Sequence, residues 1–256
     1  METPDRATSL RILNIAATLL TILINILANS LPLNGVTTGE ISDRYPVYFV
    51  PAGYVFSIWG LIYIGLLAFS IYQFLPGESV IEDVRRIGYR YALGCLGNIL
   101  WLFFWHYGVL ALTPIPMLVL LITLISTYTR LGIGKRTITR ETKWMLHVPF
   151  SIYLGWITVA TVANISTVLY AAGWHGSQFW AFLMMLVAAG LAVVAVLTRR
   201  DLAYTLVIAW ALLGIAVKQG GTTLVSPAAL VLTIVLVVLC FVVALGPTGD
   251  IPITRR

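Results

Sequence analysis

Eight stretches of the sequence are long and apolar enough to suggest membrane-spanning helices, and this feature limits the possible folds more than any other. They cover residues 12–31, 54–75, 89–109, 113–132, 146–170, 178–197, 202–218 and 227–246. A helix needs roughly 20 mostly apolar residues to cross a bilayer, and the seventh stretch is short by that measure. We therefore expect an all-α, polytopic bundle with eight transmembrane helices.

The composition excludes several water-soluble classes of protein. Of the 256 residues, 59% are hydrophobic and 10% are charged, and the mean hydropathy is +0.94. An ordinary globular domain carries about 25% charged residues, so this chain has too few charges to cover a surface that faces water. A soluble domain, a disordered chain and a nucleic-acid-binding protein are excluded, and the expected surroundings are a lipid bilayer. Cys95 and Cys240 lie in apolar runs and are expected to be small buried side chains.

The positions of the basic residues predict the topology. With eight spans, the two termini and the loops after even-numbered spans share one side, and that side holds 14 of the 16 Lys and Arg residues. The opposite side holds only Arg44 and Lys218. Because cytoplasmic loops retain Lys and Arg, we expect both termini in the cytoplasm and the chain in a bacterial inner membrane. The first stretch is longer than the roughly 7–15 residues of a signal peptide core and is expected to be an uncleaved anchor.

The ionisable residues argue against transport and catalysis. All ten acidic residues lie outside the eight stretches, whereas proton-coupled transporters use ionisable groups within the membrane and acid–base catalysis often uses paired carboxylates. We expect no enzymatic activity, no catalytic residues and no metal site. His106, His147 and His175 are expected at an interface or in solvent. The alternative is that one of them is the axial ligand of a tetrapyrrole metal, and His106 and His175 would lie on the same side.

Polar residues are concentrated on one face of the first expected helix. They are Asn14, Thr18, Thr21, Asn25 and Asn29, spaced 4, 3, 4 and 4 residues apart. Amides that face lipid lose their hydrogen bonds, so this face is expected to point into the bundle, where polar side chains join helices. The eighth stretch is almost entirely aliphatic and is expected to face lipid.

The longest connection, residues 32–53, ends in a group of aromatic residues. Tyr45, Tyr48 and Phe49 precede Tyr54 at the start of the second expected span. Aromatic residues at this position are typical of the belt at the membrane–water interface, which is the favoured interpretation. The alternative is that the loop folds over the mouth of the bundle as a lid.

Aromatic residues also recur on single faces of three expected helices. Trp59 and Tyr63 are four residues apart, as are Trp101 and Trp105, and Trp156, Ala160 and Asn164 form a third row. Such faces, with Asn98 and Asn164 as polar groups, would suit a flat apolar pocket. Ordinary core packing would give a similar pattern, and the residues alone favour neither interpretation.

Three segments resemble the motifs of the tryptophan-rich sensory protein/translocator protein (TspO/MBR) family. Pro51 to Tyr63 (PAGYVFSIWGLIY) resembles the family pattern PPxWxFxxxWxxLY, Asn98 to Phe104 (NILWLFF) resembles LNxxWxxxFF, and Tyr153 to Asn164 (YLGWITVATVAN) resembles PYxxWxxxAxxxN. The chain departs from these patterns at Ala52, Tyr54 and Ile152, and its Phe56–Trp59 spacing is one residue shorter. The family core has five spans, so residues 1–170 are expected to form that core and residues 171–256 a three-helix extension.

The resemblance implies a membrane sensor or receptor with a regulatory role that binds flat lipophilic ligands such as porphyrin, haem or sterols. It implies no obligatory cofactor, although a bound tetrapyrrole, other pigment or lipid is possible. Porphyrin degradation has been proposed for some relatives. The implied binding residues are Tyr54, Trp59, Tyr63, Asn98, Trp101, Tyr153, Trp156, Ala160 and Asn164. Their rings would stack on the macrocycle, the two amides would form hydrogen bonds, and Ala160 would leave room.

Two other functions stay open at this point. The three additional spans would suit an accessory subunit of a larger membrane complex, such as a photosynthetic complex. A facilitative carrier of small lipophilic molecules is a further alternative, because it needs no buried charge. Homodimers are typical of the family that the motifs resemble, but the three additional helices could occupy the same surface, so a homodimer and a larger complex both stay open.

Overall fold

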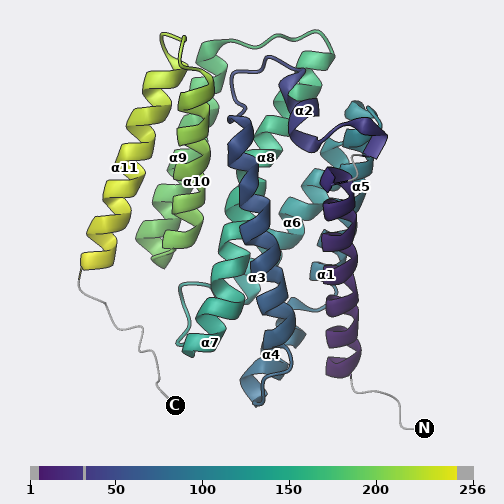
Figure 1. The fold of residues 1–256 in the computed structure, drawn as a ribbon. Helices are drawn as coiled ribbons and strands as arrows, with labels where there is room; N and C mark the ends of the chain where they lie inside the picture. The colour runs from purple at the N-terminus through teal and green to yellow at the C-terminus, as the bar shows by residue number, and fades with distance from the viewer. Residues whose placement is uncertain (1–5, 31–32, 247–256) are drawn as a thin grey trace.

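The computed structural model describes residues 6–30 and 33–246, which form helices and connecting turns without any β-strand. Long helices run side by side and make up the body of the molecule (Figure 1). They are α1 (Arg6–Ser30), α3 (Ile58–Tyr72), α5 (Arg90–His106), α6 (Pro114–Arg130), α8 (Val148–Ala171), α9 (Gln178–Arg199), α10 (Leu202–Lys218) and α11 (Val225–Leu245). The predicted all-α bundle is confirmed, and each predicted stretch overlaps one of these helices.

Short helices lie at the two ends of the bundle (Figure 1). Helix α2 (Thr38–Asp43) lies at one end, and α4 (Glu78–Ile87) and α7 (Arg140–Thr142) lie at the other. We call these the α2 end and the α4 end. Single helical turns complete the secondary structure: η1 (Leu33–Gly35), η2 (Gly53–Ser57), η3 (Leu110–Leu112) and the π-helical turn η4 (Lys143–His147). Helix α4 forms because Val80, Val84 and Ile87 share one buried face.

Within the described residues, six helical segments are long and apolar enough to cross a bilayer. They are Arg6–Ser30, Gly53–Tyr72, Leu110–Arg130, Arg140–Ala171, Gln178–Arg199 and Val225–Leu245. Helices α5 and α10 pack in the same bundle, but each has only 17 residues. The prediction of a multi-span membrane protein is therefore supported, whereas length and composition do not confirm the count of eight spans.

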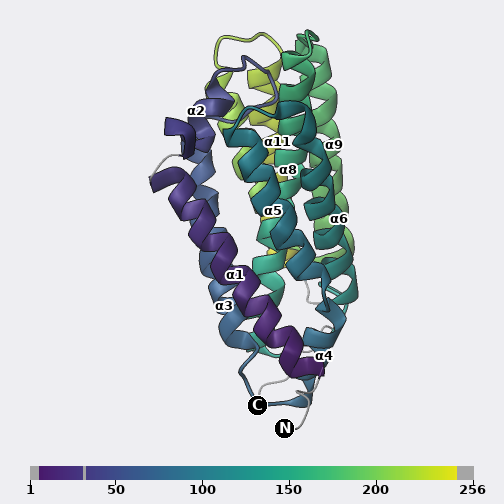
Figure 2. The same ribbon diagram turned by 90° about the vertical axis from the view of Figure 1, so that its right-hand side faces the viewer.

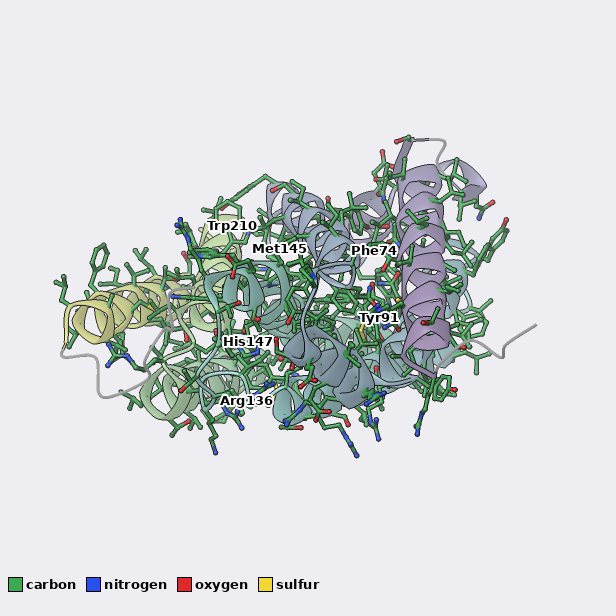
Figure 3. The ribbon with its side chains drawn as sticks, turned by 90° about the horizontal axis from the view of Figure 1, so that it is seen from below. Phe74, Tyr91, Arg136, Met145, His147 and Trp210 are labelled. Carbon is green, nitrogen blue, oxygen red and sulfur yellow. The ribbon has the colours of Figure 1, made fainter. Side chains whose placement is uncertain are left out.

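Most of the described basic residues lie on segments at the α4 end, where α1 begins and α11 ends (Figure 1). Three of their contacts tie the loops of that end together: Arg86 Nη1 to Arg130 O at 3.2 Å, Arg199 Nη1 to Ile133 O at 2.8 Å, and Arg136 Nη1 to Asp83 Oδ1 at 2.7 Å. Figure 3 views the bundle from this end and labels Arg136. Arg255 and Arg256, predicted for the same side, lie outside the described residues. That this side faces the cytoplasm stays a prediction.

The polar stripe of α1 points into the bundle, as predicted, for four of its five residues. Three of these side chains reach other helices: Asn14 Nδ2 donates to Gln73 Oε1 at 3.0 Å, Thr18 Oγ1 lies 2.6 Å from Tyr91 OH, and Asn25 Nδ2 donates to Asn98 Oδ1 at 2.8 Å. The prediction was wrong for Asn29, which is exposed. Its amide donates to the carbonyl of Asn25 in its own helix, so it needs no partner on another helix.

The other helices pack according to the size and polarity of their faces. A Cβ atom at Gly97 would lie 2.9 Å from Pro116 O, so glycine allows α5 to approach α6 closely. Helix α11 lies at the edge of the bundle, as predicted for a peripheral helix, and exposes Val231, Ile234 and Phe241; that this face contacts lipid stays a prediction. Cys95 and Cys240 are buried and unpaired, as expected.

One buried carboxylate joins three helices at the α4 end. Asp201 accepts a hydrogen bond from the backbone N–H of Tyr204 at 3.0 Å and so caps α10. Its other oxygen accepts hydrogen bonds from Tyr128 OH on α6 and Ser151 Oγ on α8, both at 2.7 Å. The start of α10 is therefore fixed to α6 and α8 through polar contacts.

Candidate functional site

A cavity with mainly aromatic walls lies between α3, α5 and α8, near the α2 end. About 40 Å³ of it is accessible to the centre of a water-sized sphere, and the 460 Å³ of empty space between its lining residues includes open solvent. Because small-molecule pockets usually hold roughly 300–1,000 Å³, a flat ligand would require the walls of this cavity to move apart. Its lining residues are Thr38, Ser42, Pro51, Phe56, Trp59, Trp101, Trp105, Trp156, Val159, Ala160, Ala163, Asn164 and Thr167. The residues that line it are uncharged.

The walls are held in place by contacts between the rings themselves. Trp59 of α3 meets Trp156 of α8 edge to face, with ring centroids 6.2 Å apart, and Phe56 meets Trp156 at 5.6 Å. On the opposite wall Trp101 and Trp105, one turn apart on α5, are stacked at 5.5 Å. These are the preferred distances and arrangements of aromatic pairs. The site therefore offers both ring faces and ring edges to a flat apolar molecule.

Two indole N–H groups at the cavity lack partners. Trp101 Nε1 and Trp156 Nε1 are buried and form no hydrogen bond with any described residue. Burying a donor without a hydrogen-bond partner costs roughly 1–3 kcal/mol. A ligand with an acceptor near these N–H groups would recover part of that free energy. The lining amide of Asn164, by contrast, already donates to Thr113 Oγ1 at 2.9 Å.

The connection from residue 33 to residue 53 folds over the bundle. Thr37 and Glu40 form a reciprocal capping box that starts α2. The backbone N–H of Thr37 and then its hydroxyl donate hydrogen bonds to the Glu40 carboxylate, and they lower the pKa of Glu40 below its ordinary value.

Helix α2 is attached to α5 beside the cavity, since the carbonyl of Thr38 accepts a hydrogen bond from Trp105 Nε1 at 3.2 Å. Figure 2 shows α2 at the end of the bundle, beyond α1 and α3. The lid, the less favoured interpretation, is therefore the one observed, and Phe49 is buried in the core.

His106 anchors this lid and is not exposed to solvent. Its Nδ1 lies 3.1 Å from Leu33 O and its Nε2 lies 3.1 Å from Thr38 Oγ1. The prediction of an interfacial or solvated side chain was wrong for His106 and also for His147, which is buried at the α4 end and labelled in Figure 3. Folding of the loop over α5 buries the first, and packing of η4 against α3 accompanies burial of the second. His175 is exposed and lies against Tyr170.

A family model described as TSPO-like protein matches residues 11–242, which is most of the chain. The chain belongs to this family. The match continues past residue 170, where the three motifs end, through α9 and α10 and into α11. Comparison with curated proteins and with solved structures finds no match. Membership in the TSPO-like family supports a membrane sensor or binding protein and names no ligand.

Five of the nine predicted binding residues line the cavity of this TSPO-like protein. They are Trp59, Trp101, Trp156, Ala160 and Asn164. The structure brings them together from α3, α5 and α8, the three helices on which the aromatic rows were found. The helical spacing of those rows is the reason that each helix presents one continuous aromatic or small-residue face.

The other four predicted residues lie outside the cavity lining. Tyr54 is 47% exposed and packs against Trp210 of α10, with ring centroids 5.4 Å apart. Tyr63, one turn after Trp59 on α3, stacks on the Trp59 ring with centroids 5.8 Å apart. Asn98 accepts from Asn25 and donates to Tyr153 OH at 3.2 Å, and both Asn98 and Tyr153 are buried. These last two residues join helices, so their polar groups are occupied within the protein.

The sequence interpretation missed several lining residues of the TSPO-like cavity. Ala163 and Thr167 continue the α8 row one turn further, so helical periodicity contained a signal for both. Trp105 was placed on an aromatic face but was not among the binding residues that the resemblance implied. Thr38 and Ser42 had no such signal, because they reach the cavity only when α2 folds back over it.

Proposed function

We propose that this TSPO-like protein is a membrane receptor that binds flat lipophilic ligands of the tetrapyrrole class and does not catalyse a reaction. The observation that carries the proposal is the aromatic cavity with two unpartnered indole N–H groups, at Trp101 and Trp156. Stacked and edge-on rings suit the faces of a macrocycle. The free N–H groups suit carbonyl or carboxylate oxygens at its edge.

The lining residues fit the body of such a ligand rather than a metal at its centre. Among the described residues, no His, Cys, Met or charged side chain lines the cavity, and both ring nitrogens of His106 already have partners. Binding is thus proposed to depend on ring contacts, on the indole N–H groups and on closure by α2. A regulatory role would follow if occupancy changed the position of α2.

We also propose that α5 and α10 cross the bilayer together with the six longer segments. Each has 17 residues and a length of roughly 25 Å, a little less than a typical hydrocarbon core of about 30 Å. Helix α5 packs against α1 and α6, and α10 packs against α8, α9 and α11. Eight crossings place the described ends of α1 and α11 on one side, and the surplus of Lys and Arg there favours the cytoplasm of a bacterial inner membrane.

The proposed function is tested by titrating the full chain, purified in detergent micelles, with protoporphyrin IX and following tryptophan fluorescence. Trp59→Ala and Trp156→Ala are each expected to weaken binding about tenfold, or about 1.4 kcal/mol. Trp144→Ala is the matched control, because Trp144 is 57% exposed at the α4 end. If both cavity variants bind like the unaltered chain, the cavity is not the binding site.

A further inference from the structure

Helix α10 contacts the segment that forms one edge of the cavity. The carbonyl of Gly214 accepts a hydrogen bond from the backbone N–H of Ala52 at 3.1 Å. Trp210 Nε1 donates to the carbonyl of Val55 at 3.3 Å, and Figure 3 labels Trp210. Pro51 and Phe56, which are adjacent in the sequence to Ala52 and Val55, line the cavity. The edge of the cavity is therefore attached directly to a helix that carries no lining residue.

Two more contacts attach α10 and the turn after it to the lid. Lys218 Nζ forms an ion pair with Asp43 Oδ1, the last residue of α2, at 2.6 Å. Gln219 Nε2 donates to the carbonyl of Val47 at 3.2 Å. Together with the Gly214 and Trp210 contacts, these two contacts are distributed along the whole segment from the end of α2 to η2.

The segment between α2 and η2 depends on such contacts because it has little regular structure of its own. It contains Pro46 and Pro51, which have no N–H to donate. Irregular backbone at the depth of a membrane is tolerated where the protein supplies its hydrogen-bond partners. Helix α10 and its following turn supply two of these partners, at Ala52 and Val47.

The approach of the two segments also requires a glycine on α10. A Cβ atom at Gly214 would overlap Val55 Cγ2 and would lie 3.0 Å from Pro51 Cβ. Val55 is fully buried and its β-branched side chain has few rotamers. A methyl group at position 214 must therefore push η2 and Pro51 away from α10.

Helix α10 is itself fixed, so it can act as a support. Asp201 ties its first turn to Tyr128 and Ser151. Near that end, a Cβ at Gly155 of α8 would lie 3.1 Å from Tyr204 O, which shows how closely the two backbones approach. The far end of α10 then holds the cavity edge at a set distance from α8.

We propose that α10 is a positioning element for the ligand cavity, with Gly214 and Trp210 as the positioning residues that hold Pro51 and Phe56 against the bound molecule. This assigns a role in ligand binding to a helix of the C-terminal extension. The prediction for ligand affinity rests on the proposed function, whereas the prediction for the backbone of residues 47–55 does not.

The first experiment measures amide hydrogen exchange in the ligand-free full chain. Gly214→Ala is compared with Gly190→Ala on α9, where an added Cβ meets no atom within 4 Å. Trp210→Phe is compared with Trp180→Phe, because Trp180 Nε1 forms no hydrogen bond with a described residue. Exchange at Ala52 and Val55 is expected to be about tenfold faster in the two α10 variants only. Equal exchange in each variant and its control would overturn the proposal.

The second experiment measures protoporphyrin IX affinity by tryptophan quenching in the same variants. Gly214→Ala is expected to weaken binding about tenfold, and the double variant Gly214→Ala/Val55→Ala is expected to recover most of the loss, because it removes the overlapping methyl groups. If the unaltered chain binds no porphyrin, the proposed function fails while the exchange result still decides the role of α10. If exchange rises and affinity is unchanged, α10 orders the segment without positioning it for ligand, and the proposal is wrong.

If Gly214→Ala does not fold, Trp210→Phe still tests the proposal, because it removes one N–H and keeps an aromatic ring. Size-exclusion elution and helical circular dichroism of each variant serve as the folding controls. An unfolded Gly214→Ala together with a folded Trp210→Phe that exchanges like Trp180→Phe would count against the proposal.

Discussion

The side-chain amide of Asn25 donates a hydrogen bond to the side-chain carbonyl of Asn98 at 2.8 Å, and both residues are almost completely buried. This pair joins α1 to α5. The amide of Asn98 also donates a hydrogen bond to Tyr153 OH on α8. An amide that the motif resemblance assigned to ligand binding is therefore occupied in holding three helices together.

Replacement of Asn98 should lower stability rather than ligand affinity. Asn98→Leu is expected to reduce the free energy of unfolding by about 1–2 kcal/mol, because it removes the hydrogen bonds that join Asn98 to Asn25 of α1 and to Tyr153 of α8. The double variant Asn25→Leu/Asn98→Leu should recover part of the loss. Denaturant unfolding in micelles measures both. If Asn98→Leu leaves stability unchanged and lowers protoporphyrin affinity about tenfold, Asn98 binds the ligand and this prediction is wrong.

Filling the cavity should separate binding from folding. Ala160 lines the cavity and is only partly buried, so Ala160→Leu is expected to occupy the ligand space and weaken protoporphyrin binding at least about tenfold. The melting temperature should change little. Ala111→Leu, at an exposed position near the same end, is the control. Equal affinities in the two variants would show that the ligand lies elsewhere.

The capping box of α2 should make the lid sensitive to acid. Hydrogen bonds from Thr37 lower the pKa of Glu40, so the ionised carboxylate stabilises α2 above the ordinary Glu pKa of about 4.3. This contribution is lost as the pH falls through the lowered value. Amide exchange within α2, corrected for intrinsic rates, should therefore rise on acidification. In Glu40→Gln, exchange should already be raised at neutral pH and should depend less on pH. A parallel pH dependence in both proteins would argue against the role of this carboxylate.

Asp201 should be essential for the attachment of α10. Asp201→Ala removes the helix cap and the acceptor for two hydroxyl groups, and the free energy of unfolding is expected to fall by about 2 kcal/mol or more. Asp201→Asn keeps an acceptor at the cap and should lose less. Denaturant unfolding compares the two. Equal losses would mean that the cap contributes little and that the charge matters.

Iron should add little to tetrapyrrole binding. Because no His, Cys or Met lies among the cavity-lining residues that the structure describes, haem and metal-free protoporphyrin IX should bind with affinities within a few-fold of each other. The absorption spectrum of bound haem should lack the features of histidine ligation, and His106→Ala should not change it. A histidine-ligated spectrum that His106→Ala or His175→Ala abolishes would contradict this.

Local patterns in the sequence were sufficient for the helices and for part of the cavity. The long helices occur where apolar runs predict them, because a chain in a bilayer satisfies its backbone hydrogen bonds within each helix. The α1 stripe and the aromatic rows follow from helical periodicity, which places residues three or four apart on one face. The same local patterns did not show that Asn164 would line the cavity while Asn98 would be buried between α1, α5 and α8, although both amides form hydrogen bonds with other segments.

The sequence by itself determined that this chain is a helical membrane protein of the TSPO-like type and which helix faces are aromatic, polar or aliphatic. Only the tertiary structure decided that the loop after α1 closes the cavity, that His106 holds this lid, and that α10 supports the cavity edge through Gly214 and Trp210. These contacts join residues 68 to more than 150 positions apart. Such contacts depend on the relative positions of whole helices, which no periodicity within one segment can encode.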